Sequence, residues 1–191
     1  MALRSIRVVL LAFVAAAALP ACAACPKDWY LWDPCPTAWG KRPAAAAAKD
    51  VQKLPDNLPP VTITSQPGDG AWAEFNRQGF MTVVNFRTAG EGVDVSGDPV
   101  VSHGMEYFHI PVEGANVTAA DADALAKILA GSGNQRVLLY CSSGNRAAGV
   151  WAAYLGRHHG VSADTAVAAG NAAGISKDKV RDAVRSAIAA D

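Results

Sequence analysis

The sequence predicts an α/β domain with a mainly parallel sheet. Short apolar runs of strand length alternate along the chain with longer segments of helical periodicity, and such alternation is typical of strands connected by crossover helices. The length of 191 residues allows one domain and leaves room for a leader and a linker.

Four runs of apolar and β-branched residues have the length of strands. Turn and Gly-rich stretches bound them, as expected for strands that end at loops. The second run lies between Gly79 and Gly90 and is largely apolar, which favours a buried central strand. The strands are expected at residues 61–64, 81–86, 106–112 and 137–140.

Five further segments carry helix signals. Asp69, in the turn before the first of them, is expected to cap that helix. Thr118 and Asp121 have the spacing of a capping box at the start of the second, which a Gly-Ser-Gly stretch ends. The helices are expected at residues 71–78, 118–130, 147–158, 162–172 and 177–189.

Residues 1–23 have the features of an export signal. Two Arg residues precede an apolar run that is too short to span a bilayer comfortably, and Ala21-Cys22-Ala23 is typical of a cleavage site. Leu19-Pro20-Ala21-Cys22 also resembles a bacterial lipobox, in which Cys22 would be lipidated. The sequence therefore predicts an exported protein that is either periplasmic or anchored to the membrane as a lipoprotein.

Residues 24–60 are expected to form a Trp-containing arm and an Ala/Pro-rich linker ahead of the domain at 61–191. Cys25 and Cys35 flank a short segment of this arm. Because disulfides persist in exported proteins, we expect these two residues to pair. A metal site is disfavoured, since no His lies nearby and the spacing is wrong for a zinc knuckle.

The charge balance argues against a general nucleic-acid binder. Seventeen Lys and Arg residues match 17 Asp and Glu residues, so a general nucleic-acid binder is not expected. The sequence shows neither a metal-ligand constellation nor a Gly-rich nucleotide motif. We therefore expect no metal, no cofactor and no nucleic-acid partner, and membrane attachment only through a lipid on Cys22.

Residues suited to nucleophilic catalysis and anion binding follow the last predicted strand, where a short loop leads into a helix. The backbone N–H groups of such a loop form an anion cradle, and Arg146 adds a bidentate donor. The same positive field favours the thiolate of Cys141, which is the expected nucleophile. A buried structural Cys beside a surface Arg is the alternative. The expected substrate-binding residues are Ser142, Ser143, Gly144, Asn145 and Arg146.

The segment Cys141-Ser-Ser-Gly-Asn-Arg146 resembles the short Cys-x4-Arg signature of the phosphatase-like domains of beta-lactamase hydrolase-like proteins. These belong to the broad dual-specificity and tyrosine phosphatase-like superfamily. The resemblance covers most of residues 61–185 and includes, in order, Ser65-Gln-Pro67, Val83-Val-Asn-Phe-Arg87, Tyr107-Phe-His-Ile-Pro-Val112, Gly160 to Ala166 and Ala173-Gly174. It implies a four- to five-stranded sheet flanked by helices and a hydrolase that forms a phospho-cysteine intermediate on a phosphorylated protein or small molecule.

The resemblance also implies a general acid on the loop after the strand at 106–112. Glu113 occupies that position and is our candidate. Asp121 is the second choice, although its capping role explains it more simply. Arg87 is expected to pair with Glu91 rather than to bind the substrate.

The loop departs from the superfamily in ways that leave two other functions open. Members usually have a Cys-x5-Arg loop, a His before the Cys and a hydroxyl residue after the Arg, whereas this chain has Tyr140 and Ala147 there. The shorter loop is similar to that of rhodaneses, so a sulfurtransferase carrying sulfane sulfur on Cys141 is one alternative. A non-catalytic anion-binding module is the other.

Overall fold

The computed structural model describes residues 54–92 and 96–191, together with the backbone of Trp29–Tyr30. The expected export signal at 1–23, the lipidation at Cys22 and the Cys25–Cys35 disulfide therefore lie outside the described residues. Within the described residues, none of the helices has both the length and the apolar character needed to span a membrane.

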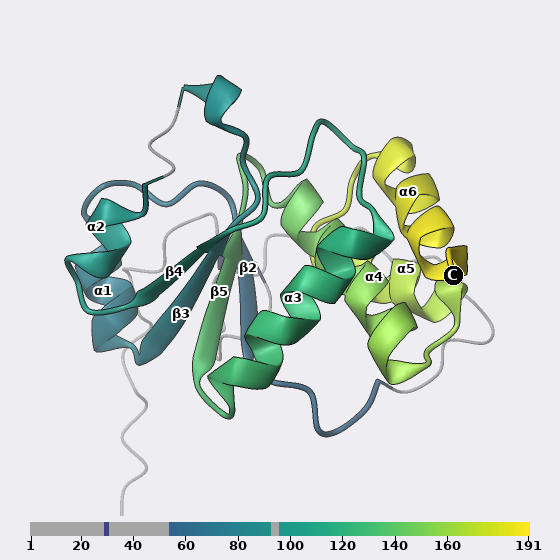
Figure 1. Ribbon diagram of the computed structural model, residues 1–191, viewed down its shortest axis with the longest axis horizontal. Coiled ribbons are helices and arrows are strands. Elements are labelled where there is room, and N and C mark those ends of the chain that lie inside the picture. The colour runs from purple at the N-terminus through teal and green to yellow at the C-terminus, as the bar shows by residue number, and fades with distance from the viewer. Residues whose placement is uncertain (1–28, 31–53, 93–95) are drawn as a thin grey trace, which may run out of the picture.

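The strands form one sheet in the order β1-β2-β5-β3-β4 (Figure 1). Strands β2 (Val61–Thr64), β5 (Arg136–Tyr140), β3 (Phe80–Asn85) and β4 (Glu106–His109) run parallel to one another. Strand β1 (Trp29–Tyr30) pairs antiparallel with β2. This arrangement confirms the predicted α/β fold with a mainly parallel sheet of four to five strands.

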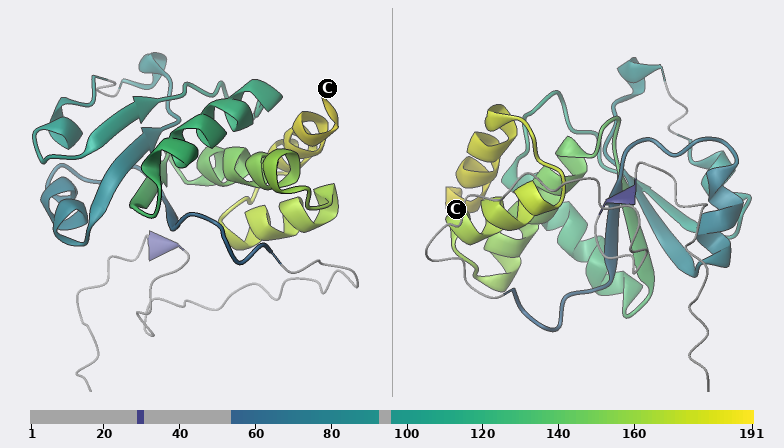
Figure 2. Two further views of the ribbon diagram at one scale, coloured as in Figure 1. Left: turned by 60° about the horizontal axis from the view of Figure 1, so that its bottom comes forward. Right: turned by 180° about the vertical axis from the view of Figure 1, so that it is seen from behind.

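Helices cover both faces of the sheet (Figure 2). The smaller group packs on one face, against side chains of β3 and β5, and the larger group packs on the other face. The smaller group is α1 (Ala71–Arg77) and α2 (Asp98–Val101). The larger group is α3 (Ala119–Ser132), α4 (Asn145–His159), α5 (Ala163–Ala172) and α6 (Asp178–Ala189).

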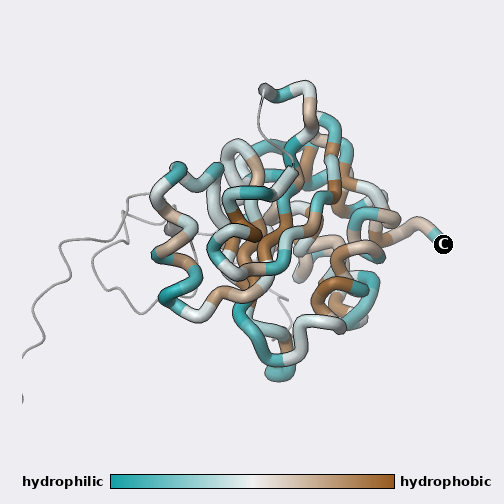
Figure 3. Tube along the Cα trace, turned by 60° about the vertical axis from the view of Figure 1, so that its left-hand side comes forward, coloured by the Kyte–Doolittle hydropathy of each residue, from teal (hydrophilic) through white to brown (hydrophobic). Residues whose placement is uncertain are grey.

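Successive residues of the central strands face opposite cores, as the two-residue period of a strand requires. Leu138 of β5 and Val83 of β3 lie in the core with α1, whereas Leu139 and Val84 lie in the core with α3 and α4. All four are fully buried. The apolar stretches are accordingly concentrated in the interior of the trace (Figure 3).

Two expectations about local structure are wrong. Asp69 does not cap α1; the cap is Gly70, and the N–H of Ala71 is satisfied by the Gly68 carbonyl at 2.9 Å. The strand expected at 106–112 ends at His109, although Ile110 still donates to the carbonyl of Asn85 at 2.9 Å. The N–H of Val112 also donates to the carbonyl of Phe86 at 3.2 Å, so backbone pairing continues past Pro111 without regular strand geometry.

The segment between β3 and β4, expected to be a loop, contains a short helical turn, η1 (Ala89–Glu91), and α2. The capping box at the start of α3 is confirmed, because the N–H of Thr118 donates to the Asp121 carboxylate at 2.8 Å. Asp121 is therefore committed to holding the helix end.

Helix α4 is the central helix of the larger core, with α3, α5 and α6 packed around it (Figure 1). Gly149 permits a close approach of α6, since a Cβ there would lie 2.7 Å from Cγ1 of Val180. This packing brings the α5–α6 connection to the N-terminal end of α4, where Ser176 contacts Asn145.

Candidate active site

The β5–α4 loop lies where the chain leaves the sheet and enters the central helix. Tyr140 ends β5, and α4 begins at Asn145. Gly144 has a φ of 83°, in the left-handed region that glycine adopts at little cost, and it makes the sharp turn into the helix. Cys141 is fully buried and is a free thiol, at the positive end of a 15-residue helix.

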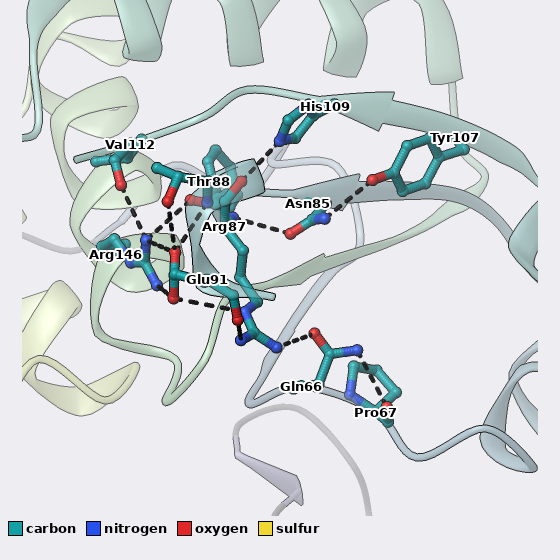
Figure 4. Close-up of polar contacts among 11 residues, drawn as sticks. Gln66, Pro67, Asn85, Arg87, Thr88, Glu91, Tyr107, His109, Val112 and Arg146 are labelled. Atoms are coloured by element: carbon teal, nitrogen blue, oxygen red, sulfur yellow. Dashed lines mark hydrogen bonds and ion pairs between the residues drawn. The ribbon is translucent and has the colours of Figure 1, made fainter. Parts of the chain in front are cut away.

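Arg146 lies in the first turn of α4, and its side chain is only 10% exposed. Its Nη1 donates to Oε2 of Glu91 at 2.6 Å, and its Nη2 donates to Oε1 at 2.7 Å (Figure 4). Nη1 also donates to the carbonyls of Val112 at 2.9 Å and Phe86 at 3.4 Å. One end of the guanidinium is thus fixed by protein oxygens.

The other edge of the same guanidinium keeps two donors. A guanidinium has five N–H groups, and the contacts above use those of Nη1 and one of Nη2. Within the described part of the chain, neither Nε–H nor the second Nη2–H donates to an oxygen acceptor. Together they form a fork that matches two oxygens of a phosphate or sulfate group.

Cys141 lies within electrostatic reach of this guanidinium. Hydrogen bonding to Glu91 raises the pKa of Arg146 above its ordinary value, and burial opposes that rise. Cys141 contributes to the rise through its charge and through a hydrogen bond. The structure therefore brings together the two residues that the sequence singles out as nucleophile and anion binder.

Glu91 is the principal partner of Arg146. Its Oε2 also accepts hydrogen bonds from the N–H of Thr88 at 2.8 Å and from the Thr88 hydroxyl at 3.2 Å. The hydrogen bonds from Arg146, aided by Thr88 and opposed by burial, lower the pKa of Glu91 to about 2. Glu91 is consequently ionised at neutral pH and has no proton to give to a leaving group.

Arg87 connects this ion pair to a third loop. It pairs with Glu91 at 3.5 Å from Nε to Oε1, which is the pairing expected from the sequence. Its Nη1 donates to Oε1 of Gln66 at 2.8 Å (Figure 4), and the N–H of Gln66 donates to the carbonyl of Ser142 at 3.4 Å. The turn after β2, the loop after β3 and the loop after β5 are thereby joined.

The backbone of Arg87 is held as firmly as its side chain. Its N–H donates to Oδ1 of Asn85 at 2.8 Å, and its carbonyl accepts a 2.6 Å hydrogen bond from Nε2 of His109. Nδ2 of Asn85 in turn donates to the hydroxyl of Tyr107 at 2.9 Å (Figure 4). Residues of β3 and β4 therefore fix the loop that presents Glu91.

The remaining loop residues divide into exposed and buried positions. Ser142 and Ser143 are exposed, whereas Gly144 and Asn145 are buried. Oδ1 of Asn145 accepts hydrogen bonds from the N–H of Ser176 at 2.8 Å and from the Ser176 hydroxyl at 3.2 Å. Nδ2 of Asn145 contacts Oγ of Ser143 at 3.4 Å.

Glu113 is near the site through the backbone. It directly follows Val112, whose carbonyl contacts Arg146, and its own carbonyl accepts a 2.8 Å hydrogen bond from Asn116 in a tight turn. Glu113 is exposed, and its carboxylate makes no hydrogen bond with another described residue. Glu113 thus has an exposed carboxylate directly after the residue whose carbonyl holds Arg146.

The sequence predicts Glu91 only as a partner of Arg87 and does not predict its ion pair with Arg146. A signal was present: Thr88 and Glu91 have capping-box spacing directly after a buried strand. Among the described residues, no group of three or more His, Cys, Asp or Glu side chains is arranged to hold a metal ion.

The sequence model described as "Beta-lactamase hydrolase-like protein, phosphatase-like domain" matches residues 58–158. The Beta-lactamase hydrolase-like protein of Xylella fastidiosa strain Temecula1 is 31% identical over 100 residues, which are 50% of this chain and 23% of that protein. Its counterpart in Agrobacterium fabrum strain C58 is 32% identical over 92 residues, 46% of this chain and 21% of that protein. The match thus spans less than a quarter of the length of these curated relatives.

Among solved structures, Tk-PTP in its active form has a TM-score of 0.59 at 17% identity, covering 75% of this chain and 97% of that one. Pseudomonas aeruginosa TpbA has a TM-score of 0.55 at 22% identity, covering 70% and 81%. These likenesses show a shared fold with known phosphatases. Because the family match covers more than half of the sequence, the chain belongs to the family of phosphatase-like domains of beta-lactamase hydrolase-like proteins.

Proposed function

We propose that this protein is an exported, cysteine-dependent phosphatase-like hydrolase that acts on phosphate monoesters. One observation carries the proposal: Cys141 lies within reach of an Arg146 guanidinium whose one end is fixed by Glu91 and whose other edge keeps two donors. A nucleophile beside a prepositioned oxyanion site is what displacement at phosphorus requires.

The reaction would proceed in two steps. Sγ of Cys141 attacks phosphorus, the P–O ester bond breaks, and the phosphoryl group moves to sulfur while the leaving oxygen takes a proton from Glu113. Water then attacks phosphorus while Glu113 takes a proton from it, the S–P bond breaks, and inorganic phosphate and the Cys141 thiolate are released. Arg146 and the loop N–H groups stabilise the charge that develops on the equatorial oxygens in both steps.

The substrate class proposed here is a phosphorylated protein or small molecule. A structure of P. aeruginosa TpbA, with a TM-score of 0.52 at 18% identity, is in complex with phosphotyrosine. That complex supports a phosphate monoester as the ligand of this fold. We propose neither a cofactor nor a nucleic-acid partner.

A rhodanese-like sulfurtransferase is the second candidate, and the short loop favours it. Only Ser142, Ser143 and Gly144 lie between Cys141 and the first residue of α4. In that reaction the S–S bond of thiosulfate breaks, the sulfane sulfur moves to Cys141 as a persulfide and sulfite leaves. Cyanide then removes the sulfur as thiocyanate.

A side-by-side assay of reduced mature protein separates these functions. Release of phosphate from an aryl phosphate, abolished in Cys141→Ser, supports the phosphatase. Formation of thiocyanate from thiosulfate and cyanide without phosphate release supports the sulfurtransferase and contradicts the main proposal. Binding of phosphate without either reaction identifies a non-catalytic anion-binding module.

Export and anchoring form a separate part of the proposal, which rests on the sequence of residues 1–23. We propose a periplasmic protein or a lipoprotein attached through Cys22, with Cys25 and Cys35 paired. Mass spectrometry of the mature N-terminus distinguishes a diacylated Cys22 from a free Ala24. An intact Met1 in the purified cellular protein would contradict export.

A further inference from the structure

A chain of three hydrogen bonds leads from the α5–α6 connection into the β5–α4 loop. Ser176 donates to Oδ1 of Asn145 through its N–H at 2.8 Å and through its hydroxyl at 3.2 Å. Nδ2 of Asn145 reaches Oγ of Ser143 at 3.4 Å. Asn145 is buried, while Ser143 is exposed.

The chemistry of these groups determines which atom donates and which accepts in each of these hydrogen bonds. A backbone N–H can only donate, so the Asn145 atom that faces Ser176 must be the carbonyl oxygen. The amide nitrogen must then face Ser143, and it too can only donate. The Ser143 hydroxyl therefore acts as acceptor toward Asn145, which leaves its own O–H free to donate in another direction.

We propose that the Ser143 hydroxyl is a side-chain donor to the substrate oxyanion, and that Asn145 and Ser176 are positioning residues that orient it. The inference rests on the proposed function for the identity of the ligand, a tetrahedral oxyanion of the phosphate type. Ser143 would touch that ligand, whereas Asn145 and Ser176 act only through Ser143.

The short β5–α4 loop explains why an additional side-chain donor would be needed. With three residues between Cys141 and α4, few backbone N–H groups are available to surround a tetrahedral anion. An oriented hydroxyl supplies one more donor without lengthening the loop. Ser176 also lies beyond residues 58–158, so the α5–α6 connection contributes to the site from outside the region that the family model matches.

Binding of tungstate, measured by titration calorimetry, tests the inference without requiring turnover. Ser143→Ala should weaken binding about tenfold, as expected for the loss of one hydrogen bond to a charged ligand. Ser143→Thr, which keeps the hydroxyl, should restore most of the affinity. Loss of affinity in both variants to the same extent would overturn the role of the hydroxyl.

Asn145→Asp separates positioning from folding. A carboxylate still accepts both hydrogen bonds from Ser176, so the melting temperature should stay near that of the wild type. It cannot donate to Ser143 and it brings a negative charge to the loop, so tungstate binding should weaken more than tenfold. Unchanged affinity in this variant would overturn the inference.

Asn171→Ala is the matched control, because it removes an Asn that hydrogen-bonds Arg181 within the same helical pair but does not contact the loop. Its affinity for tungstate should equal that of the wild type.

The inference and the proposed phosphatase function can fail separately. If the wild type hydrolyses no phosphate ester but Ser143→Ala still binds tungstate more weakly than the wild type, the inference is supported and the phosphatase proposal is contradicted. If the wild type hydrolyses phosphate esters efficiently and neither Ser143→Ala nor Asn145→Asp changes the rate, the phosphatase proposal is supported and the inference is contradicted.

Discussion

Glu91 and Arg146 form a two-point ion pair, with Nη1 2.6 Å from Oε2 and Nη2 2.7 Å from Oε1. The two residues are 55 positions apart in the sequence and meet at the carboxyl edge of the parallel sheet. The pair fixes the plane of the guanidinium before any ligand binds. A planar fork fixed in advance loses little conformational freedom when an oxyanion arrives.

Glu91→Gln should therefore impair function more than folding. Only one of the two terminal atoms of the amide can accept a hydrogen bond, and its NH2 group would face a guanidinium donor, so the guanidinium loses its fixed plane and its charge partner. We expect kcat/KM for an aryl phosphate to fall ten- to a hundredfold, and the free energy of unfolding to fall by about 2 kcal/mol. Steady-state kinetics and urea unfolding measure these two changes. A variant with wild-type kcat/KM would show that the pair is only structural.

The same pair should make stability depend on pH in acid. The pKa of Glu91 is lowered from 4.5 to about 2 in the folded state, because Arg146 hydrogen-bonds the carboxylate. A lowered pKa adds stability that is complete above the unfolded pKa and is lost as the pH falls toward the folded pKa. The difference in unfolding free energy between wild type and Glu91→Gln should thus shrink by about 2 kcal/mol between pH 5 and pH 2. A constant difference would contradict the assignment.

Glu113 is expected to matter only where the leaving group needs a proton. Its carboxylate makes no hydrogen bond with another described residue and it follows the carbonyl that holds Arg146. Glu113→Gln should lower kcat about a hundredfold for an alkyl phosphate and much less for a nitrophenyl phosphate, whose oxygen leaves unprotonated. Equal rates of wild type and variant on the alkyl ester would exclude Glu113 as the acid.

Close packing at Gly149 should be necessary for the position of α6, which follows the connection that contains Ser176. A Cβ at this position would lie 2.7 Å from Cγ1 of Val180 in α6 and 3.0 Å from Cγ2 of Val117 before α3, so these neighbours must move. Gly149→Ala should lower the free energy of unfolding by about 1–3 kcal/mol. Gly131→Ala in α3 is the control, because a Cβ there meets no atom within 4 Å. Similar unfolding midpoints for the two variants would contradict this account.

Residue patterns were sufficient to predict the sheet and most helices. The buried runs at β3 and β5 and the capping box of Thr118 and Asp121 are local signals, and the structure confirms them. Local signals failed at Asp69, where the Gly68 carbonyl already satisfies the N–H that the side chain was expected to cap. Backbone geometry of this kind is set by the turn itself rather than by residue type.

The candidate site was only half predictable. Cys141 and Arg146 lie on one loop, so their proximity follows from six residues of sequence. The contacts of Arg146 with Glu91 and of Asn145 with Ser176 join segments 55 and 31 residues apart. Such pairs depend on how strands are ordered in the sheet and how helices stack, which a single sequence does not encode as a local pattern.

The central claim is that Cys141 carries the phosphoryl group. The most direct measurement is to quench the reduced protein during turnover of an aryl phosphate, digest it and analyse the peptide that contains Cys141 by mass spectrometry. The account predicts a phosphoryl adduct on Cys141 in the wild type, and neither adduct nor turnover in Cys141→Ser. Phosphate release that persists in Cys141→Ser would contradict it.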